Sequence, residues 1–406
     1  MDEKARFVVG IDVGTSSIRA VMGSVGSDGV ISVVGYGESV SEGMRRGSVK
    51  ELTLPAKAID ECLAQVESMS GLKVSDAVVG ISSTSLNSVK IDGMIAVGVA
   101  DHEINNEDLD RIEDAAIAGK IPANRQVLDL APYEYILDGQ GGIREPLGMK
   151  GARLEMRASV VSVLLPDYEN LQKIFNNIQV NATIYPTAMA AADAVLTPRQ
   201  KENGVGLVNI GGSTTSVVVY DEGELQYLGV VPIGSNDITK DLATVLATVP
   251  EIAEEIKVRF ATCRFGEPGK DITIKRGHDE YVFSRAEIDE VVEARLEEIF
   301  EGVRKQLKNA GYDKRLPEGI VLTGGGAKLR EIENYARTQV ELAVRIGKPS
   351  GLTGVSDNVL KPEYAAAVGL MMLDEGRQVT ASKKHFGGKK GKSAGGFLKN
   401  IFKLFK

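Results

Sequence analysis

Two stretches of the chain combine glycine with hydroxyl side chains in a pattern that suits phosphate binding. Residues 7–20 read FVVGIDVGTSSIRA, and residues 205–221 read VGLVNIGGSTTSVVVYD. Each stretch has an apolar run, a polar residue, a glycine turn with hydroxyls and a second apolar run, which predicts a tight hairpin. Glycine allows close approach to a ligand, and successive backbone N–H groups and hydroxyls can surround phosphate oxygens.

The two stretches match in register at an offset of 197 residues, which pairs Asp12 with Asn209. A single turn of this kind is more often an ordinary hairpin than a phosphate-binding site. Two copies half a chain apart predict two similar halves, each presenting a hairpin to one cleft. The candidate phosphate-contacting residues are Gly14, Thr15, Ser16 and Ser17 in the first hairpin and Gly211, Gly212, Ser213 and Thr214 in the second.

Other common nucleotide motifs do not compete with the hairpins. Residues 391–393 read GKS, like the end of a P-loop, but Phe386 occupies the position of the leading glycine. The segment also lies in a glycine- and lysine-rich linker, so we reject it as a phosphate site. No GxGxxG motif follows an expected strand.

The length and composition are those of a globular protein with two domains. The chain has 406 residues, of which 43% are apolar and 26% charged. Cys62 and Cys263 lie far apart without ligand partners at metal spacing, so we expect reduced thiols in or near the core. The polar N-terminus and the lack of an apolar run of about 18 residues predict a cytoplasmic protein.

The net charge of −8 is unevenly distributed. Residues 377–406 contain nine basic side chains and no acidic one, which leaves 39 basic against 56 acidic side chains before them. An acidic body repels nucleic acid, so we expect no nucleic-acid partner, whereas the basic end suits an anionic surface.

The end of the chain has two parts with different patterns. Residues 377–396 are rich in glycine, lysine and serine and predict a flexible linker, whereas residues 397–406 predict an amphipathic helix. Its apolar face comprises Phe397, Leu398, Ile401, Phe402, Leu404 and Phe405, and its polar face includes Lys399 and Lys403. The pattern favours an anchor on anionic membrane lipid over a helix docked on the protein itself. Because so short a helix binds weakly, it also indicates self-assembly, which multiplies the attachment.

Hydrophobic periodicity predicts an α/β protein. Expected helices span residues 54–68, 107–118, 171–179, 185–196, 238–246, 250–263, 284–310 and 364–373, and expected strands besides the hairpins include 30–37, 77–81, 230–234 and 319–323. Residues 84–163 interrupt the alternation of strands and helices in the first half, which predicts an inserted subdomain. Gly324, Gly325 and Gly326 follow a buried strand, at the end where α/β proteins bind ligands.

Several sequence features occur in the order seen in a known superfamily. They are GIDVGT at 10–15, YPTA at 185–188, NIGGST at 209–214, IKVR at 256–259, TGGG at 323–326 and Gly369 in a small-residue helix. In that order they resemble the nucleotide-binding signatures of the superfamily of actin, heat-shock chaperone ATPases and sugar kinases.

Within that superfamily the whole chain resembles the bacterial cell-division FtsA family. The segments that carry this resemblance are YEYI at 133–136, DGQGGI at 138–143, PLGM at 146–149, GARL at 151–154, GIVLTGGGA at 319–327 and the amphipathic C-terminus. That family places an inserted subdomain in the first half, where residues 84–163 lie in this chain.

The resemblance implies an α/β, actin-like ATPase fold with two similar lobes around a nucleotide cleft, each with a smaller subdomain. The implied units are 1–83 with 164–199 (first lobe), 84–163 (inserted subdomain), 200–235 with 318–376 (second lobe), 236–317 (its subdomain), 377–396 (linker) and 397–406 (membrane helix). ATP would place its phosphates on the two hairpins, with Mg²⁺ near Asp12 through water. Adenine and ribose would lie against Gly324–Gly326, Glu254 and Lys257.

The resemblance also implies a cell-division protein that polymerises on the inner face of the plasma membrane and is peripheral to it. It would anchor the division-ring protein FtsZ there and help to recruit later division proteins. The C-terminal peptide of FtsZ would dock on residues 236–317. Arg304 and Lys308 are candidate contacts, although basic side chains on a helix more often form a solvated face.

Two positions depart from the superfamily pattern. Asn209 stands where relatives usually have an aspartate that helps to hold hydrated Mg²⁺ and orient the attacking water. Tyr185 stands before Pro186, where chaperone relatives have a glutamate. Phosphoryl transfer depends on positioning and charge stabilisation. We therefore expect Asp12 and Asn209 to form a degraded catalytic pair, with ATP bound but hydrolysed slowly or not at all.

Other functions are known on similar folds. A small-molecule kinase would need a catalytic aspartate near the insertion and has no use for a lipid-seeking tail. A chaperone ATPase would need a further substrate domain, for which residues 374–406 are too few. A pilus-assembly actin-like protein typically lacks the amphipathic C-terminus, so the tail favours the cell-division function over all three.

Overall fold

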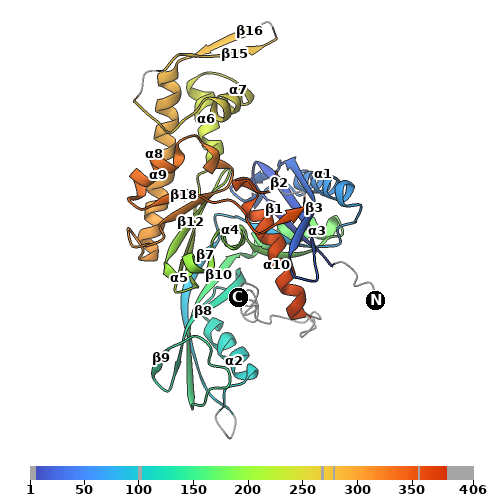
Figure 1. Cartoon of the computed structure of the whole chain (residues 1–406), viewed down its shortest axis with the longest axis vertical. Coiled ribbons are helices and arrows are strands. Elements are labelled where there is room, and N and C mark those ends of the chain that lie inside the picture. Colours follow the sequence, from blue (N-terminus) through green and yellow to red (C-terminus); the bar gives the residue numbers. More distant parts are fainter. Residues whose placement is uncertain (1–5, 99–102, 267–268, 278, 355–356, 382–406) are drawn as a thin grey trace.

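Two β-sheets with the same strand connectivity form the two halves of the molecule (Figure 1). The computed structural model describes residues 6–98, 103–266, 269–277, 279–354 and 357–381. The first sheet contains β1 (Arg6–Val13), β2 (Ser17–Val25), β3 (Ile31–Val40), β6 (Asp76–Ile81), β11 (Asn181–Pro186) and β19 (Thr353–Gly354). The second contains β12 (Val205–Ile210), β13 (Thr215–Asp221), β14 (Glu224–Val231), β17 (Ile320–Thr323) and β18 (Val344–Ile346).

The two sheets correspond strand by strand. Their orders are β11-β6-β1-β2-β3-β19 and β14-β13-β12-β17-β18. In each sheet three consecutive antiparallel strands form a meander, and two later strands add in parallel beside the first strand of that meander. Strands β12 and β13 are buried along almost their whole length, as in sheets covered on both faces. The predicted pair of similar lobes is confirmed.

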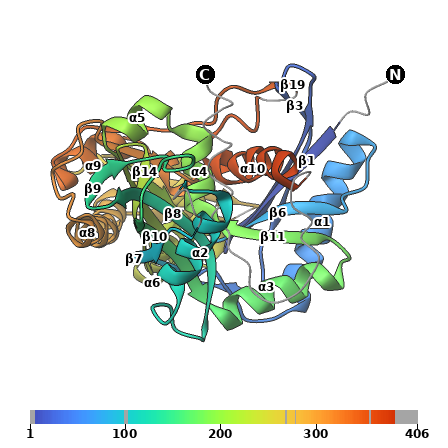
Figure 2. The same cartoon turned by 90° about the horizontal axis from the view of Figure 1, so that it is seen from below.

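Helices cover the outer faces of both sheets. They are α1 (Thr53–Ser70), α3 (Leu165–Asn177), α8 (Arg285–Ala310) and α9 (Ile332–Val340). α1 packs on β2 and β3 and lies beside α3 (Figure 2), while α8 packs on β13 and β14. The sequence of α1 explains its position, because its buried residues recur at helical spacing and it ends where Gly71 adopts a φ of 72°.

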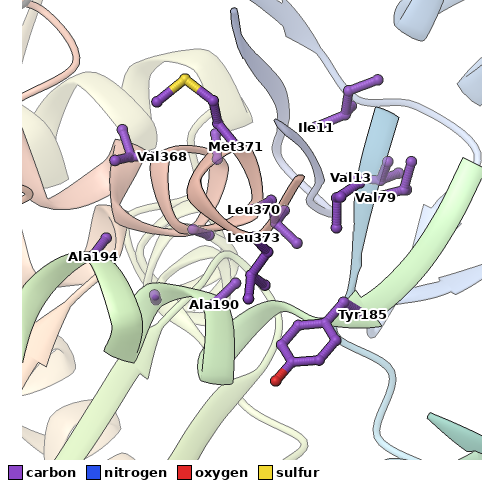
Figure 3. Close-up of a cluster of buried hydrophobic side chains, with 14 of the residues drawn as sticks. Ile11, Val13, Val79, Tyr185, Ala190, Ala194, Val368, Leu370, Met371 and Leu373 are labelled. Atoms are coloured by element: carbon purple, nitrogen blue, oxygen red, sulfur yellow. The ribbon is translucent and has the colours of Figure 1, made fainter. Parts of the chain in front are cut away.

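Two helices rich in small residues join the halves. They are α4 (Thr187–Val195) and α10 (Ala365–Ala381). α4 packs along α10 and contacts β12 and β13 of the second sheet, whereas α10 lies across β1, β2 and β6 of the first. Figure 3 shows Leu370 and Met371 of α10 beside Ile11 and Val13 of β1, with Ala190 of α4 below them.

Glycine makes these contacts possible. A Cβ at Gly369 would overlap the Ala190 carbonyl on α4, and a Cβ at Gly10 would overlap the backbone of α10 at Ala367 and Met371. The backbones of α4, α10 and β1 are therefore in direct contact, and no larger side chain fits at these two positions.

The C-terminal segment belongs with the first lobe. β19 pairs with β3, and α10 packs on β1. The assignment of 318–376 to the second lobe is therefore wrong from Thr353 onward, because the small residues of α10 fit the glycine-containing surface of β1. α10 also extends through Ala381, into the predicted linker at 377–396, where Arg377 and Gln378 favour helix. The predicted membrane helix at 397–406 lies outside the described residues.

Besides α10, three expected helices differ at their ends. The helix expected at 171–179 is α3, which begins earlier, at Leu165, and ends at Asn177. Tyr185 and Pro186 end strand β11 instead of beginning a helix, and Tyr185 is buried against the central helices (Figure 3). The expected helix at 250–263 ends at Arg259. Tyr185, Ala261 and Cys263 are buried although they lie outside the helices. Helical periodicity predicts that such residues are buried, but it does not show whether they belong to the helix.

The inserted subdomain is a four-stranded antiparallel sheet with one helix on it, at the bottom of Figure 1. It comprises β7 (Asn87–Ala96), β8 (Arg125–Leu137), β9 (Gln140–Ile143), β10 (Arg153–Leu164) and α2 (Asn106–Ile117). Ile91, Ile112 and Met156 are among the buried residues of its separate core. An expected helix at 107–118 corresponds to α2, which is capped by Asn105.

A second subdomain extends from the second sheet at the opposite end of the molecule (Figure 1). It comprises α6 (Ser235–Val245), α7 (Pro250–Arg259), β15 (Ile272–Arg276), β16 (Asp279–Phe283) and the start of α8. The hairpin of β15 and β16 was not expected, although Ile272 and Ile274 alternate with exposed residues along β15 and could have indicated a strand.

The remaining elements are short. They are β4 (Met44–Arg45), β5 (Ser48–Val49), α5 (Pro198–Asn203), η1 (Gly325–Lys328) and η2 (Pro362–Tyr364). Cys62 and Cys263 are buried free thiols, as expected, and burial raises the pKa of each to about 12. None of the described helices combines the length and the apolar content that crossing a membrane requires.

Replacing Gly369 with alanine is expected to destabilise the protein. Alanine favours a helix over glycine by about 1 kcal/mol, but the overlap with the Ala190 carbonyl costs about 3 kcal/mol. The unfolding free energy in urea should therefore fall by about 2 kcal/mol. Gly325→Ala is the control, since no atom lies within 4 Å of an added Cβ there. Equal stability of both variants would contradict direct backbone packing of α4 on α10.

Candidate functional site

A cleft of about 290 Å³ lies between the two lobes, at the ends of the strands that carry the hairpins. Its size is near the lower limit for small-molecule sites, about 300 Å³. Its walls come from both lobes and from the central helices. The predicted residues that line it are Asp12, Gly14, Thr15, Ser16, Ser17, Asn209, Gly211, Gly212, Thr214, Glu254, Lys257, Gly324, Gly325 and Gly326.

The two hairpins have the same turn geometry. The N–H of Gly14 donates to the carbonyl of Ser17 at 3.2 Å, and the N–H of Gly211 donates to the carbonyl of Thr214 at 2.9 Å. The strand registers also agree, since Asp12 lies opposite Arg19 and Asn209 lies opposite Ser216. The repeat in the sequence is therefore a repeat in structure.

The hairpins contact each other across the cleft. Ser213 Oγ donates to Thr15 Oγ1 at 2.8 Å, and Ser16 Oγ donates to Asn236 Oδ1 at 3.0 Å. A Cβ at Gly212 would overlap Ser16 Oγ, so a larger residue there would displace the Ser16 hydroxyl from its present position. The predicted Ser213 thus contacts the first hairpin without itself lining the cleft.

The N-terminus of α6 is fixed to the second hairpin. The N–H groups of Ser235 and Asn236 donate to the carbonyls of Gly211 and Gly212 at 2.9 and 2.7 Å. Asn236 thereby brings its side chain to Ser16 of the other lobe. This residue was missed from the sequence, because its role depends on a contact between lobes.

Asp12 is the carboxylate of β1 that lines the cleft. Burial raises its pKa to about 6, and the positive charge of Arg19 partly opposes that effect. Arg19 itself lines the cleft and binds Glu38 at 2.6 Å, while its Nε has no hydrogen-bond partner among the described residues. Arg19 was not predicted, although its position opposite Asp12 in the hairpin could have indicated it.

Thr187 is a second residue that the sequence analysis missed. It begins α4, lines the cleft and is 3% exposed, and its Oγ1 has no hydrogen-bond partner among the described residues. A Cβ placed on Gly80 would lie 2.6 Å from this hydroxyl and 3.5 Å from Asp12 Oδ1. The hydroxyl and the carboxylate therefore lie on the same part of the cleft floor.

The glycine triplet after β17 forms the opposite wall. Gly324 has a φ of 84°, and a Cβ there would overlap Asn209 Oδ1. The triplet therefore lies directly against the second hairpin, which requires glycine. Gly325 is exposed in the cleft, with no protein atom within 4 Å of an added Cβ.

Glu254 and Lys257 line the cleft from α7. Lys257 is buried, and its Nζ lies 2.7 Å from Glu254 Oε2 and 2.8 Å from Thr239 Oγ1. Next to the glycine triplet, Lys328 binds the nearly buried Glu363 at 2.6 Å, and both residues also line the cleft. The last two were not predicted, because residues 328 and 363 are far apart in the sequence.

The candidate partner-peptide residues are elsewhere. Arg304 and Lys308 lie on α8, and neither lines the cleft. Lys308 is exposed and Arg304 is partly buried.

The site suits a hydrated metal ion carried by a phosphate ligand. Among the described residues, no three histidine, cysteine or carboxylate side chains cluster as a metal site would require. Mg²⁺ in nucleotide sites commonly uses one or two carboxylates, retained waters and the phosphates themselves. Asp12 supplies such a carboxylate, and the unpaired Thr187 hydroxyl lies near it.

The solved structures that resemble this chain share the actin-like ATPase fold. The PilM–PilN type IV pilus biogenesis complex matches with a TM-score of 0.66 and 16% identity, covering 90% of this chain and 97% of that one. MreB5 of Spiroplasma citri bound to ADP matches with a TM-score of 0.56 and 14% identity, covering 94% and 99%. The MamK double helical filament matches with a TM-score of 0.53 and 13% identity, covering 91% and 99%. Identities this low establish the fold alone.

Sequence comparison is more specific. A family model for "Cell division protein FtsA" matches residues 206–369, and a model for "SHS2 domain inserted in FTSA" matches residues 83–162. The cell division protein FtsA of Pseudomonas aeruginosa is 36% identical over 91% of this chain and 89% of its own length. The FtsA proteins of Neisseria meningitidis and Escherichia coli are 34% and 30% identical, covering 91% and 90% of this chain and 91% and 90% of their own lengths. The chain therefore belongs to the FtsA family of actin-like cell-division proteins.

Proposed function

We propose that this cell-division protein binds ATP, forms filaments on the inner face of the plasma membrane and tethers FtsZ there. The main support for ATP binding is that two equivalent glycine hairpins meet at one cleft. Ser213 Oγ of one hairpin lies 2.8 Å from Thr15 Oγ1 of the other. Family membership supports the role in division. The amphipathic pattern of residues 397–406 supports the membrane part.

The two hairpins would hold the phosphates of ATP through backbone N–H groups and hydroxyls, from Gly14–Ser17 on one side and Gly211–Thr214 on the other. Arg19 adds a guanidinium from the floor of the cleft. Mg²⁺ would be held by the phosphates and by Asp12 through water, and it would neutralise phosphate charge.

Adenine and ribose would lie between α7 and the glycine triplet. This part of the cleft has an open surface at Gly325 and a fixed polar wall at Glu254 and Lys257. Because Lys257 is held by Glu254 and Thr239, its ammonium group is kept in place. A preorganised wall of this kind lowers the entropic cost of binding.

Slow hydrolysis follows from the residues at the cleft floor. Asn209 supplies an amide where a carboxylate would orient water, and Tyr185 is buried in the core. An amide cannot accept a proton or supply the negative charge of a carboxylate. ATP would then act mainly as a bound component that holds the lobes together.

The proposed membrane and partner contacts use different parts of the chain. The lysines and the apolar residues of 397–406 would bind anionic lipid, and the C-terminal peptide of FtsZ would bind the subdomain at 236–317, near Arg304 and Lys308. Later division proteins would then assemble on the resulting filament. Electron microscopy of the protein with ATP on anionic lipid monolayers would reveal filaments, and their absence would argue against assembly.

Gly325→Val is expected to weaken ATP binding without lowering stability. No protein atom lies within 4 Å of a Cβ at this position, so the added side chain projects only into the cleft. Isothermal titration with Mg-ATP should show at least about tenfold weaker affinity, the equivalent of 1.4 kcal/mol. The urea unfolding midpoint should match that of the unaltered protein. Unchanged affinity would place the nucleotide elsewhere.

Asn209→Asp is expected to raise ATP turnover, because it restores a carboxylate at the cleft floor. The unaltered protein should release phosphate more slowly than about 1 per second, and the variant should be faster by about tenfold or more. Asn209→Ala, which also lacks the charge, is the control and should stay slow. Rapid turnover by the unaltered protein would refute the degraded site.

Co-sedimentation with liposomes would test membrane and FtsZ binding together. The full chain should pellet with anionic vesicles and carry FtsZ with it, and removal of residues 396–406 should leave both proteins in the supernatant. Lys399→Glu with Lys403→Glu should weaken pelleting, because charge attraction is lost.

Arg304→Glu with Lys308→Glu should still pellet but carry less FtsZ. Equal FtsZ recovery in that last variant would move the peptide site away from α8.

A further inference from the structure

The inserted subdomain is attached to both lobes of the protein. The chain leaves the first lobe after Ile81 to form β7, and it returns to the first lobe at Leu165 after β10. Strands β7, β8 and β10 contact β14 of the second lobe. In Figure 1 it lies below the junction of the lobes. A subdomain placed in this way is sensitive to how the lobes are arranged.

The attachment to the second lobe is a hydrogen-bonded latch between β7 and β14. Ser88 Oγ accepts from the N–H of Leu228 at 2.7 Å and donates to the Leu228 carbonyl at 3.2 Å. Two residues along each strand, Lys90 Nζ donates to Gln226 Oε1 at 3.2 Å. Leu228 is 1% exposed, so Ser88 satisfies a buried backbone donor and acceptor on the edge of the second sheet.

The strand that carries the latch continues directly to the cleft. β14 ends at Val231, and the chain then runs to α6. The carbonyl of Ile233 accepts from Thr215 Oγ1 at 2.9 Å, which fixes this connection to β13. The next turn supplies Asn236, which lines the cleft and contacts Ser16 of the first hairpin.

The attachment to the first lobe also leads to the cleft. Asp167 Oδ2 accepts from Ser83 Oγ and Ser85 Oγ, both at 2.6 Å. Ser83 Oγ lies 3.3 Å from Ser48 Oγ on the β4–β5 hairpin. The tip of that hairpin reaches the first phosphate-binding turn, because the N–H of Gly47 donates to Thr15 Oγ1 at 3.2 Å.

The two attachments are close together in the chain. Ser85 of the first-lobe attachment and Ser88 of the latch are separated by three residue steps, which span at most about 11 Å. Arg125 restrains this short connection further, with bonds to the Ser85 carbonyl and to Asn87 Oδ1. A relative movement of the lobes therefore has to change the latch or the first-lobe attachment.

We propose that Ser88 is a positioning residue for the nucleotide, acting through β14 to hold the second hairpin and α6 in place against the first. The inserted subdomain then serves as a brace across the two lobes. This inference rests on the proposed ATP binding in the cleft and adds a site of control to it. Ser88 does not line the cleft, so its effect on ATP is indirect.

Thermodynamic linkage makes the coupling reciprocal. If the latch favours the arrangement that binds ATP, ATP favours the closed latch by the same factor. A partner that binds the inserted subdomain and pulls β7 from β14 would weaken ATP binding. One that holds the latch closed would strengthen it.

The test compares Mg-ATP affinity in the full chain and in serine variants, measured by isothermal titration. Ser88→Ala should bind about fivefold to tenfold more weakly, within the usual range of coupling between sites. Ser88→Thr keeps the hydroxyl and should restore affinity. Ser24→Ala on β2, outside both the latch and the cleft, is the matched control and should bind like the unaltered protein.

Hydrogen exchange supplies a readout that a merely structural role would not move. ATP should slow exchange of the Leu228 amide in the unaltered protein, and this protection should be smaller in Ser88→Ala. Lys90→Met removes the outer bond of the latch and the cation–π contact of Lys90 with Tyr133, and it leaves the Ser88 bonds in place. It keeps the proposal testable if Ser88→Ala fails to fold, and it should give a smaller loss of affinity.

Three outcomes would overturn the proposal. Equal ATP affinity of folded Ser88→Ala and the unaltered protein would show that the latch does not act on the cleft. Equal amide exchange rates of residues 224–231 with and without ATP would show that ATP binding does not act on the latch. Failure of the unaltered protein to bind ATP would overturn the proposed function itself, and the coupling with it.

Discussion

Direct backbone contact between α4, α10 and β1 sets the spacing of the two lobes. Gly10, Ala190 and Gly369 permit that contact, since a larger side chain at either glycine would overlap main-chain atoms. The hairpins lie at the ends of strands on both sides of these helices, so the spacing also decides whether Thr15 and Ser213 can meet. The cleft is therefore a consequence of how tightly small residues pack at the centre of the molecule.

Under the proposed function, the cleft would hold a phosphate ligand and cleave it slowly. Both hairpins line the cleft with hydroxyl side chains, which can donate to phosphate oxygens and do not titrate near neutral pH. The equivalent position to Asp12 carries the neutral Asn209. A ligand that binds only the arrangement with both hairpins in contact stabilises that arrangement by mass action. Under the proposed function, such binding would fix how the two lobes are set relative to each other.

The sequence predicted those parts of the fold that are determined locally. The hairpins, α1 and α2 follow from residue patterns a few positions long, and the repeat at an offset of 197 residues indicated their meeting. The placement of α10 on β1 and the end of β11 at Pro186 depend on which distant surface buries an apolar face, and periodicity does not specify this. For the same reason, the cleft residues that the sequence analysis missed, such as Thr187 and Asn236, matter through contacts between segments far apart in the chain.

The two lobes share a backbone design but differ in charge at equivalent positions. Asp12 and Arg19 lie opposite each other in the first hairpin, and their counterparts Asn209 and Ser216 are both neutral. At these two equivalent positions the charged groups therefore come from the first lobe, and the second lobe supplies an amide and a hydroxyl. A phosphate ligand held between the two hairpins, as proposed, would therefore meet a different electrostatic field on each side. The two hairpins are thus alike in backbone geometry and different in charge at two equivalent positions.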